Sequence, residues 1–262
     1  MKQKMPNNNL RITFLGTGTS QGVPVVASDE PVSYSTDPRD KRLRTSIMIE
    51  IGEKIFVVDT GPDFRQQMLR ENVKRLDAVL FTHEHKDHVA GLDDVRPFFF
   101  IQKDPIDLYA EKRVQDAIKR DFHYAFAEEW YPGVPRFNLH DINGKPVDVK
   151  GESITPIRAY HHKMPVYGFR VQDFTYITDA NYIPEEEKEK IKGSKILVLN
   201  ALRKTEHLSH FTLYEAVEVA KEMEVEQAFF THISQFMGFH EETNKELPSN
   251  MALAYDGLKI EL

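Results

Sequence analysis

The stretch LFTHEHKDH at residues 80–88 is the most informative part of the sequence. It begins as the end of an apolar strand and then delivers three histidines and one aspartate within six positions. Side chains two apart in an extended segment point to the same side, so His83 and His85 can hold one ion. The chain then turns, which lets Asp87 and His88 face a second ion nearby. Imidazole and carboxylate groups suit zinc, manganese or iron.

Further residues of metal-ligand type stand at the ends of other predicted strands. Asp179 ends the stretch TYITD, and His232 ends the stretch FFTH. The stretch IRAYHH ends in two histidines, His161 and His162. A dinuclear site needs more ligands than one loop supplies, and carboxylates can bridge two ions. We therefore expect these strand ends to complete a site for two metal ions.

The composition limits the other kinds of site. The chain has 262 residues and no cysteine, which excludes disulfides, a thiolate nucleophile and cysteine-bound zinc or iron–sulfur centres. Its net charge of −7 argues against a non-specific nucleic-acid binder, which carries a basic excess. The polar start and the short apolar runs argue against an export signal or a membrane span. We expect one globular domain over residues 1–262, located in the cytoplasm, with no membrane partner and no stable nucleic-acid partner.

Short β-branched and aromatic runs alternate with helical patterns along the chain. The predicted strands are residues 10–14, 46–51, 55–58, 78–81, 154–160, 168–171, 174–177, 196–199 and 227–230, and the predicted helices are residues 63–71, 112–126, 184–192 and 212–223. Thr212 and Glu215 have the spacing of a capping box at the start of the last helix. This order predicts two sheets with helices outside them. The aromatic segment 98–136 is expected to be a helical insertion, with a lid or a dimer contact as the alternatives.

With these motifs, the chain resembles the metallo-β-lactamase superfamily. The likeness rests on the H-x-H-x-D-H segment, the later histidines and aspartate, and the opening LGTGTSQGVP at residues 15–24. Within the superfamily, the sequence is most similar to the phosphoribosyl cyclic phosphodiesterases of the carbon–phosphorus lyase pathway, with tRNase Z more distant. The resemblance implies an α+β fold, a four-layer αββα sandwich with the metals at one edge between the sheets.

The resemblance also implies a role for each candidate residue. His161 is preferred to His162 because related sequences often read H-x-K/H-x-P at this point. Asp59 would orient the histidines as a hydrogen-bond acceptor behind them. Asp87 and His210 are the candidate catalytic residues, and His210 matches the proton donor of the cyclic phosphodiesterases. The ligands implied for two divalent ions, zinc or manganese, are His83, His85 and His161 on the first ion, Asp87, His88 and His232 on the second, and Asp179 between them.

The sequence departs from its relatives where they carry a cysteine-bound structural zinc. Ser28, Glu30 and Ser33 stand in place of the cysteines, and Gln235 stands in place of a histidine. No structural zinc is therefore expected, and the loop at residues 25–44 must be held by packing and hydrogen bonds or be mobile. The basic run at residues 39–44 is a candidate phosphate contact, although charge runs are usually solvated.

These observations predict a dinuclear metal-dependent hydrolase, and the resemblance implies a phosphodiesterase that opens a small cyclic phosphate of the phosphoribosyl 1,2-cyclic phosphate type. Two ions would lower the pKa of a bridging water, and the resulting hydroxide would attack phosphorus. The alternatives are a tRNase Z-like nuclease that processes RNA 3′ ends, a thiolester or lactam hydrolase of the same fold, and a non-catalytic metal-binding scaffold. The sequence leaves open the natural substrate, the metal used in the cell and whether the chain forms a homodimer.

Overall fold

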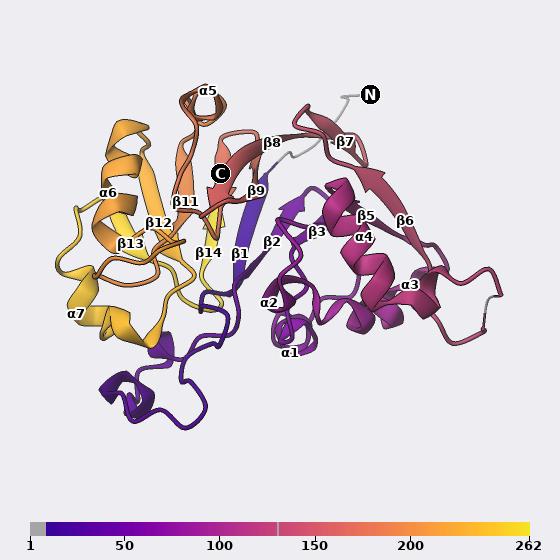
Figure 1. The fold of residues 1–262 in the computed structure, drawn as a ribbon, viewed down its shortest axis with the longest axis horizontal. Helices are drawn as coiled ribbons and strands as arrows, with labels where there is room; N and C mark the ends of the chain where they lie inside the picture. The colour runs from indigo at the N-terminus through magenta and orange to yellow at the C-terminus, as the bar shows by residue number, and fades with distance from the viewer. Residues whose placement is uncertain (1–8, 130) are drawn as a thin grey trace, which may run out of the picture.

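Two seven-stranded sheets form the centre of the computed structural model, which describes residues 9–129 and 131–262 (Figure 1). The first sheet has the order β14 (Lys259–Glu261), β1 (Leu10–Gly16), β2 (Ser46–Ile51), β3 (Lys54–Val58), β4 (Ala78–Leu80), β5 (Ile106–Ala110) and β6 (Phe137–Asp141). The second has the order β13 (Met251–Leu253), β12 (Gln227–Thr231), β11 (Ile196–Asn200), β10 (Phe174–Ile177), β9 (Met164–Val171), β8 (Glu152–His161) and β7 (Val147–Val149).

Helices lie outside each sheet (Figure 1). The first sheet is accompanied by α1 (Phe64–Arg70), α2 (Lys86–Val89), α3 (Arg96–Gln102) and α4 (Lys112–Asp121), and the second by α5 (Glu185–Lys188), α6 (Leu213–Glu222) and α7 (His240–Asn244). Short 3₁₀ helices are η1 (Pro31–Tyr34), η2 (Pro38–Asp40), η3 (Leu92–Val95), η4 (His123–Phe126) and η5 (Gln235–Met237). The predicted capping box of α6 is confirmed, because the Thr212 hydroxyl accepts from the Glu215 backbone N–H and the Glu215 carboxylate accepts from that of Thr212.

The largest apolar core lies between the two sheets. Phe14 and Phe56 of the first sheet belong to the same buried cluster as Phe169 and Tyr176 of the second. Two further clusters bury the outer faces of the sheets against the helices. Removal of this apolar surface from water is the main force that holds the layers together. The result is a helix–sheet–sheet–helix sandwich, so the predicted four-layer αββα architecture is confirmed.

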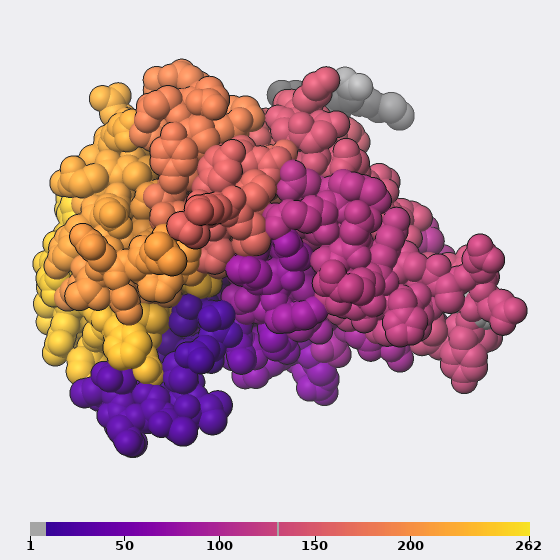
Figure 2. Space-filling model, in the orientation of Figure 1, coloured from indigo at the N-terminus to yellow at the C-terminus, as the bar shows by residue number. Residues whose placement is uncertain are grey.

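The expectation that residues 98–136 form a helical insertion is wrong. The segment contains β5, which pairs in parallel with β4 on one side and with β6 on the other. Every residue of β5 is buried, and a strand covered on both faces lacks the polar–apolar alternation that identifies strands in a sequence. The described residues of the connection from η4 to β6 project at one end of the molecule (Figure 2).

Two groups of parallel strands end near one another. β3 and β4 are parallel neighbours in the first sheet, and β10, β11 and β12 are parallel neighbours in the second. Ligands in open α/β sheets bind beyond the carboxyl ends of such strands. Asp59 follows β3, the histidine-rich stretch follows β4, Asp179 follows β10 and His232 follows β12. Among the described residues, no helix is long and apolar enough to cross a membrane.

Candidate metal centre

The backbone turns sharply at three of these strand ends. Asp59, Asp179 and His232 all have left-handed backbone conformations, with φ values of 65°, 56° and 57°. Residues other than glycine rarely adopt this conformation, and such strain tends to gather at functional sites. The turns place the side chains of Asp179 and His232 beside those of the histidine loop, defined here as residues 82–88.

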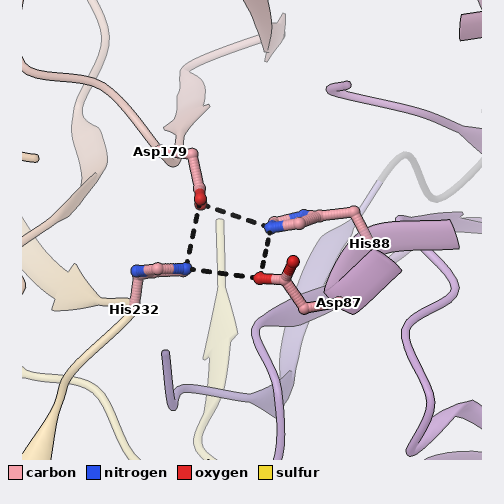
Figure 3. Close-up of side chains that lie close together, drawn as sticks. All are labelled: Asp87, His88, Asp179 and His232. Atoms are coloured by element: carbon pink, nitrogen blue, oxygen red, sulfur yellow. Dashed lines mark ion pairs between the residues drawn. The ribbon is translucent and has the colours of Figure 1, made fainter. Parts of the chain in front are cut away.

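Four side chains from both sheets form a compact cluster (Figure 3). The Nε2 atom of His88 lies 3.2 Å from Asp87 Oδ2 and 3.4 Å from Asp179 Oδ1. The Nε2 atom of His232 lies 3.2 Å from Asp179 Oδ2 and 3.7 Å from Asp87 Oδ2. One ligand atom from each of the four residues lies within 4.8 Å of the others. The arrangement therefore brings two imidazoles and two carboxylates around one point.

The imidazole nitrogens that face this point have no hydrogen-bond partner. The Nε2 atoms of His83, His88 and His232 are buried without a hydrogen-bond partner, and the three residues are at most 1% exposed. Buried polar atoms are normally satisfied by a partner. Nitrogen and carboxylate oxygen donors at this spacing match the ligands of divalent transition metals. The donor set thus fits the metal ions that the fold implies.

The charges of the cluster also favour a cation. Burial acts to lower the pKa of His232, but the Asp179 carboxylate outweighs it and raises that pKa to about 9. The pKa of His88 is raised well above its usual value, because Asp179 and Asp87 overcome the same effect of burial. Burial acts to raise the pKa of Asp179, but His232 and His88 hold it well below its usual value. Two ionised carboxylates in a buried site stabilise positive charge beside them.

Three more histidines extend the cluster beyond Asp179. The ring centroids of His83 and His85 are 4.6 Å apart, and those of His85 and His161 are 5.2 Å apart. His83 Nε2 lies 3.8 Å from Asp179 Oδ2. His161, Asp179 and His210 also offer ligand atoms within 4.8 Å of one another. All the site residues predicted from the sequence therefore meet at one edge of the sandwich, and their roles as ligands stay predictions.

The structure places His161, and not His162, in this cluster. His161 is the last residue of β8, and its Nδ1–H donates to the Ser209 carbonyl at 2.9 Å. This bond leaves Nε2 as the nitrogen available to a metal. His162 is exposed in the turn that follows, with a φ of 57°. The backbone of the β8–β9 hairpin thus separates two histidines that are adjacent in the sequence.

Asp59 and Thr82 hold the histidine loop from behind. Asp59 Oδ2 lies 2.7 Å from His88 Nδ1 and accepts from the Thr82 hydroxyl at 2.8 Å. Asp59 Oδ1 accepts from the Thr82 backbone N–H at 2.9 Å. Because the Thr82 hydroxyl donates to Asp59, it accepts from His83 Nδ1, which lies 2.9 Å away. The sequence indicated Asp59 but not Thr82, whose position at the end of an apolar strand carries no distinguishing signal.

Gly61 allows the histidine loop to pack closely against the turn after β3. A Cβ atom at this position would lie 2.1 Å from the Asp87 carbonyl oxygen, which is closer than two atoms can approach. The Thr60 backbone N–H donates to the His88 carbonyl at 2.7 Å. Residues 59–61, Asp-Thr-Gly, therefore set how closely the histidine loop packs against the turn after β3, and they also form its hydrogen bonds.

His210 lies at the edge of the cluster and is 8% exposed. Its ring centroid is 4.5 Å from that of His161 and 4.7 Å from that of His232. Burial, together with the charge of His232, lowers the pKa of His210 to about 2. To act as a proton donor, His210 would have to gain its proton with an anionic substrate, because a phosphoryl group beside the ring favours the charged imidazole.

Ser28, Glu30, Ser33 and Gln235, the positions at which the resemblance implied zinc ligands in other proteins, are linked by hydrogen bonds. The Ser28 hydroxyl donates to Gln235 Oε1 at 2.6 Å and accepts from the Glu30 backbone N–H at 3.1 Å. The Ser33 hydroxyl donates to Ser28 Oγ at 3.3 Å. These bonds attach the loop at residues 25–44 to η5, just after His232.

The basic run at residues 39–44 is engaged within the protein. Arg39 pairs with Asp37 at 2.6 Å, and Arg44 pairs with Asp63 at 3.1 Å. Buried Arg42 donates to the Ala254 carbonyl at 2.6 Å. The structure gives these arginines a role in holding the loop, and the prediction of a phosphate contact gains no support from it.

Comparison with known proteins places the chain in a family. A family model described as the beta-lactamase superfamily domain matches residues 54–233. The chain belongs to the β-lactamase superfamily. The resemblance to this superfamily that the histidine motif indicated is thereby confirmed.

One solved structure is similar over almost the whole length. The crystal structure of a diphosphatase from the PhnP family superposes with a TM-score of 0.91 and 38% identity, over 97% of each chain. Human tRNase Z, short form, has a TM-score of 0.70 and 19% identity over 95% of this chain and 98% of that one, a likeness that shows the fold alone. Membership of the superfamily and the diphosphatase likeness support a hydrolase that uses divalent metals.

A curated relative is similar over a shared region only. An octanoyltransferase of Porphyromonas gingivalis is 37% identical over 254 residues, which are 95% of this chain and 51% of that protein. A coenzyme PQQ synthesis protein B of Xanthomonas oryzae is 27% identical over 60% of this chain and 54% of that protein. The chain thus spans about half the length of these curated relatives.

Proposed function

We propose that this protein is a dinuclear metal-dependent hydrolase that cleaves small phosphodiesters. The observation that carries the proposal is the group of buried imidazole nitrogens that lie around the Asp87 and Asp179 carboxylates and have no hydrogen-bond partner. We assign His83, His85 and His161 to one ion, Asp87, His88 and His232 to the other, and Asp179 to a bridging position between them. Divalent ions held there would supply Lewis acidity and activate water at neutral pH.

Other side chains of the cluster orient these ligands or lie where a substrate would bind. Asp59 and Thr82 fix the ring orientations of His88 and His83 through their Nδ1 atoms. His210 lies beside His161 and His232, where it can donate a proton to the departing oxygen of a bound phosphodiester. Asp87 contacts both His88 and His232, and so aligns the two imidazoles of one ion.

A small cyclic phosphate of the phosphoribosyl 1,2-cyclic phosphate type is the proposed substrate. A substrate with a diphosphate bond is the second candidate, favoured by the likeness to the PhnP-family diphosphatase. In both substrates the attack is on one phosphorus atom, and the oxygen that leaves it is one that His210 can protonate. The net charge of −7 and the internal pairing of Arg39, Arg42 and Arg44 disfavour the grasp of a long nucleic acid.

Phosphorus NMR tests the proposal. Ribosyl 1,2-cyclic phosphate and a nucleoside diphosphate sugar are incubated in parallel with manganese-loaded or zinc-loaded protein. We expect metal-dependent opening of the cyclic phosphate to one monoester, and no product with the Asp179→Asn variant. Cleavage of the diphosphate alone would select the second candidate. No turnover of either substrate, with transfer RNA cleaved instead, would contradict the proposal.

A further inference from the structure

The histidine loop alternates residues that face the metal centre with residues that face α4. His83 and His85 lie toward the other ligands, whereas the two residues that follow them pair with the helix. Glu84 Oε1 accepts from Arg113 Nη1 at 2.5 Å, near the start of α4. Lys86 pairs with Asp121 at the end of the same helix. The helix therefore contacts the back of the loop at two points.

Arg113 also reaches the second sheet. Its Nη2 donates to the Pro165 carbonyl at 2.7 Å. Pro165 pairs with Tyr160 across the β8–β9 hairpin, one residue before His161. A single guanidinium group thus joins the loop that carries His83 and His85 to the hairpin that carries His161.

Neighbouring contacts brace this guanidinium. Arg113 Nε is buried without a hydrogen-bond partner, and Glu111 Oε2 forms a long ion pair with it at 4.0 Å. Glu111 accepts two hydrogen bonds from Arg158, at 2.7 and 3.2 Å, and Arg158 donates to the Tyr167 hydroxyl at 2.5 Å. The Tyr167 backbone N–H returns to the Thr82 carbonyl at 3.1 Å. These contacts therefore lead back to Thr82, the residue before His83.

The two contacts of α4 differ in strength. The side chains of Glu84 and Arg113 are 23% and 36% exposed, and Glu84 Oε2 is buried. Lys86 is 66% exposed, and exposed ion pairs contribute little. Arginine presents a planar fork that can reach two acceptors at fixed angles, which the single ammonium group of lysine cannot do. The positioning of the loop should therefore depend on Arg113 far more than on the pair of Lys86 with Asp121.

We propose that Arg113 is a positioning residue that sets the separation of His83 and His85 from His161, and through it the affinity of the ion that these histidines hold. The inference rests on the metal-binding part of the proposed function. Groups that hydrogen-bond metal ligands commonly change metal affinity 10- to 100-fold when they are replaced, and Arg113 holds residues adjacent in the chain or the hairpin to such ligands.

Metal binding is the measurement that tests this. Manganese is titrated calorimetrically into wild-type protein, Arg113→Gln and Arg113→Lys after dialysis against EDTA, and bound metal is counted by mass spectrometry. We expect one of the two ions to bind about 10- to 100-fold more weakly in both variants, with the other ion unchanged. Because lysine keeps the charge but not the fork, its failure to restore affinity shows that geometry is what matters.

Asp121→Asn is the matched control, since it breaks the exposed contact between the same helix and the same loop. We expect its two affinities to stay within twofold of wild type. Wild-type affinity for both ions in Arg113→Gln and Arg113→Lys would overturn the inference, and so would full restoration by Arg113→Lys. Failure of the wild-type protein to bind manganese or zinc would instead contradict the proposed function.

Discussion

Most imidazoles of the centre have one nitrogen fixed by the protein and the other turned toward the carboxylates. Asp59 holds Nδ1 of His88, the Thr82 hydroxyl holds Nδ1 of His83, and the Ser209 carbonyl holds Nδ1 of His161. In each case the bond fixes the Nδ1 side of the ring, so that Nε2 faces the site. The ring orientations are therefore set before any ion binds, which lowers the conformational cost of binding.

The adjacent histidines provide a prediction at this scale. His161→Asn should lose the ion that this ring faces, whereas His162→Asn should keep the metal content and turnover of wild type. Asparagine suits the second position because it tolerates a positive φ. Mass spectrometry of the purified variants counts the ions. Loss of metal from His162→Asn, with His161→Asn unaffected, would contradict the assignment.

His210 gives a second prediction. His210→Ala should lower turnover of the cyclic phosphate about 10²- to 10⁴-fold, the usual contribution of a positioned acid, with both ions retained. The exposed neighbour His207 serves as the control, and His207→Ala should stay within a few-fold of wild type. Loss of an ion from His210→Ala would make His210 a ligand beside His161 and Asp179 instead.

At the scale of single residues, the sequence could identify the types and spacing of the ligands but not every orientation. The H-x-H-x-D-H spacing is local, so it can be read directly. The decision between His161 and His162 depends on the pairing of His161 with Met164 in the hairpin, and the sequence does not show that register. The contact of Arg113 with Glu84 joins residues 29 apart that share no local pattern.

Among the elements, the loop at residues 25–44 depends on its contacts with α7. Arg42 Nη2 lies 3.1 Å from His240 Nδ1, and Asp40 Oδ1 accepts from the His240 backbone N–H at 2.7 Å. Burial first, and then Arg42 and Arg39, lower the pKa of His240 to about 4, while Asp37 and Asp40 act in the opposite sense. His240 is therefore neutral in the folded protein around pH 6, where the same residue in an unfolded chain is mostly protonated.

A pH dependence of stability follows from this loop contact. A histidine with a lowered folded pKa contributes stability that is complete above its unfolded value of 6.5 and is lost as the pH falls toward 4. By pH 5 the loss should be about 2 kcal/mol in the free energy of unfolding. Guanidinium denaturation of wild type and His240→Gln at pH 7.5 and pH 5 measures it. An equal pH dependence in the two proteins would contradict the prediction, and the exposed histidine variant His123→Gln is the control.

The elements themselves were predictable where their patterns are local. The nine predicted strands all correspond to strands of the structure, and α6 begins at its predicted cap. The sequence missed β5 because both of its faces are buried, and it missed β6 because none of its residues is fully buried. It also missed the three-residue strands β7, β13 and β14, which are too short to show a period. Pairing with distant neighbours, not intrinsic propensity, makes these segments strands.

For the molecule as a whole, the proposed centre joins two halves that are far apart in the sequence. The histidine loop follows β4 of the first sheet, whereas His161 ends a strand of the second sheet and Asp179 and His232 follow strands of that sheet. Asp179 contacts His83 and His88 of the first half and His232 of the second, so its carboxylate links the two halves. An ion held by these residues would connect the two sheets at the edge of the sandwich, outside the apolar core between them.

The stoichiometry of metal binding tests the central claim most directly. Manganese is titrated calorimetrically into EDTA-dialysed wild type, into Asp179→Asn and into Asp173→Asn, a control on an exposed turn of the same sheet. We predict two ions for each wild-type chain and for Asp173→Asn, and the loss of at least one ion in Asp179→Asn. A wild-type chain that binds no ion, or an Asp179→Asn variant that binds two with wild-type affinity, would contradict the account.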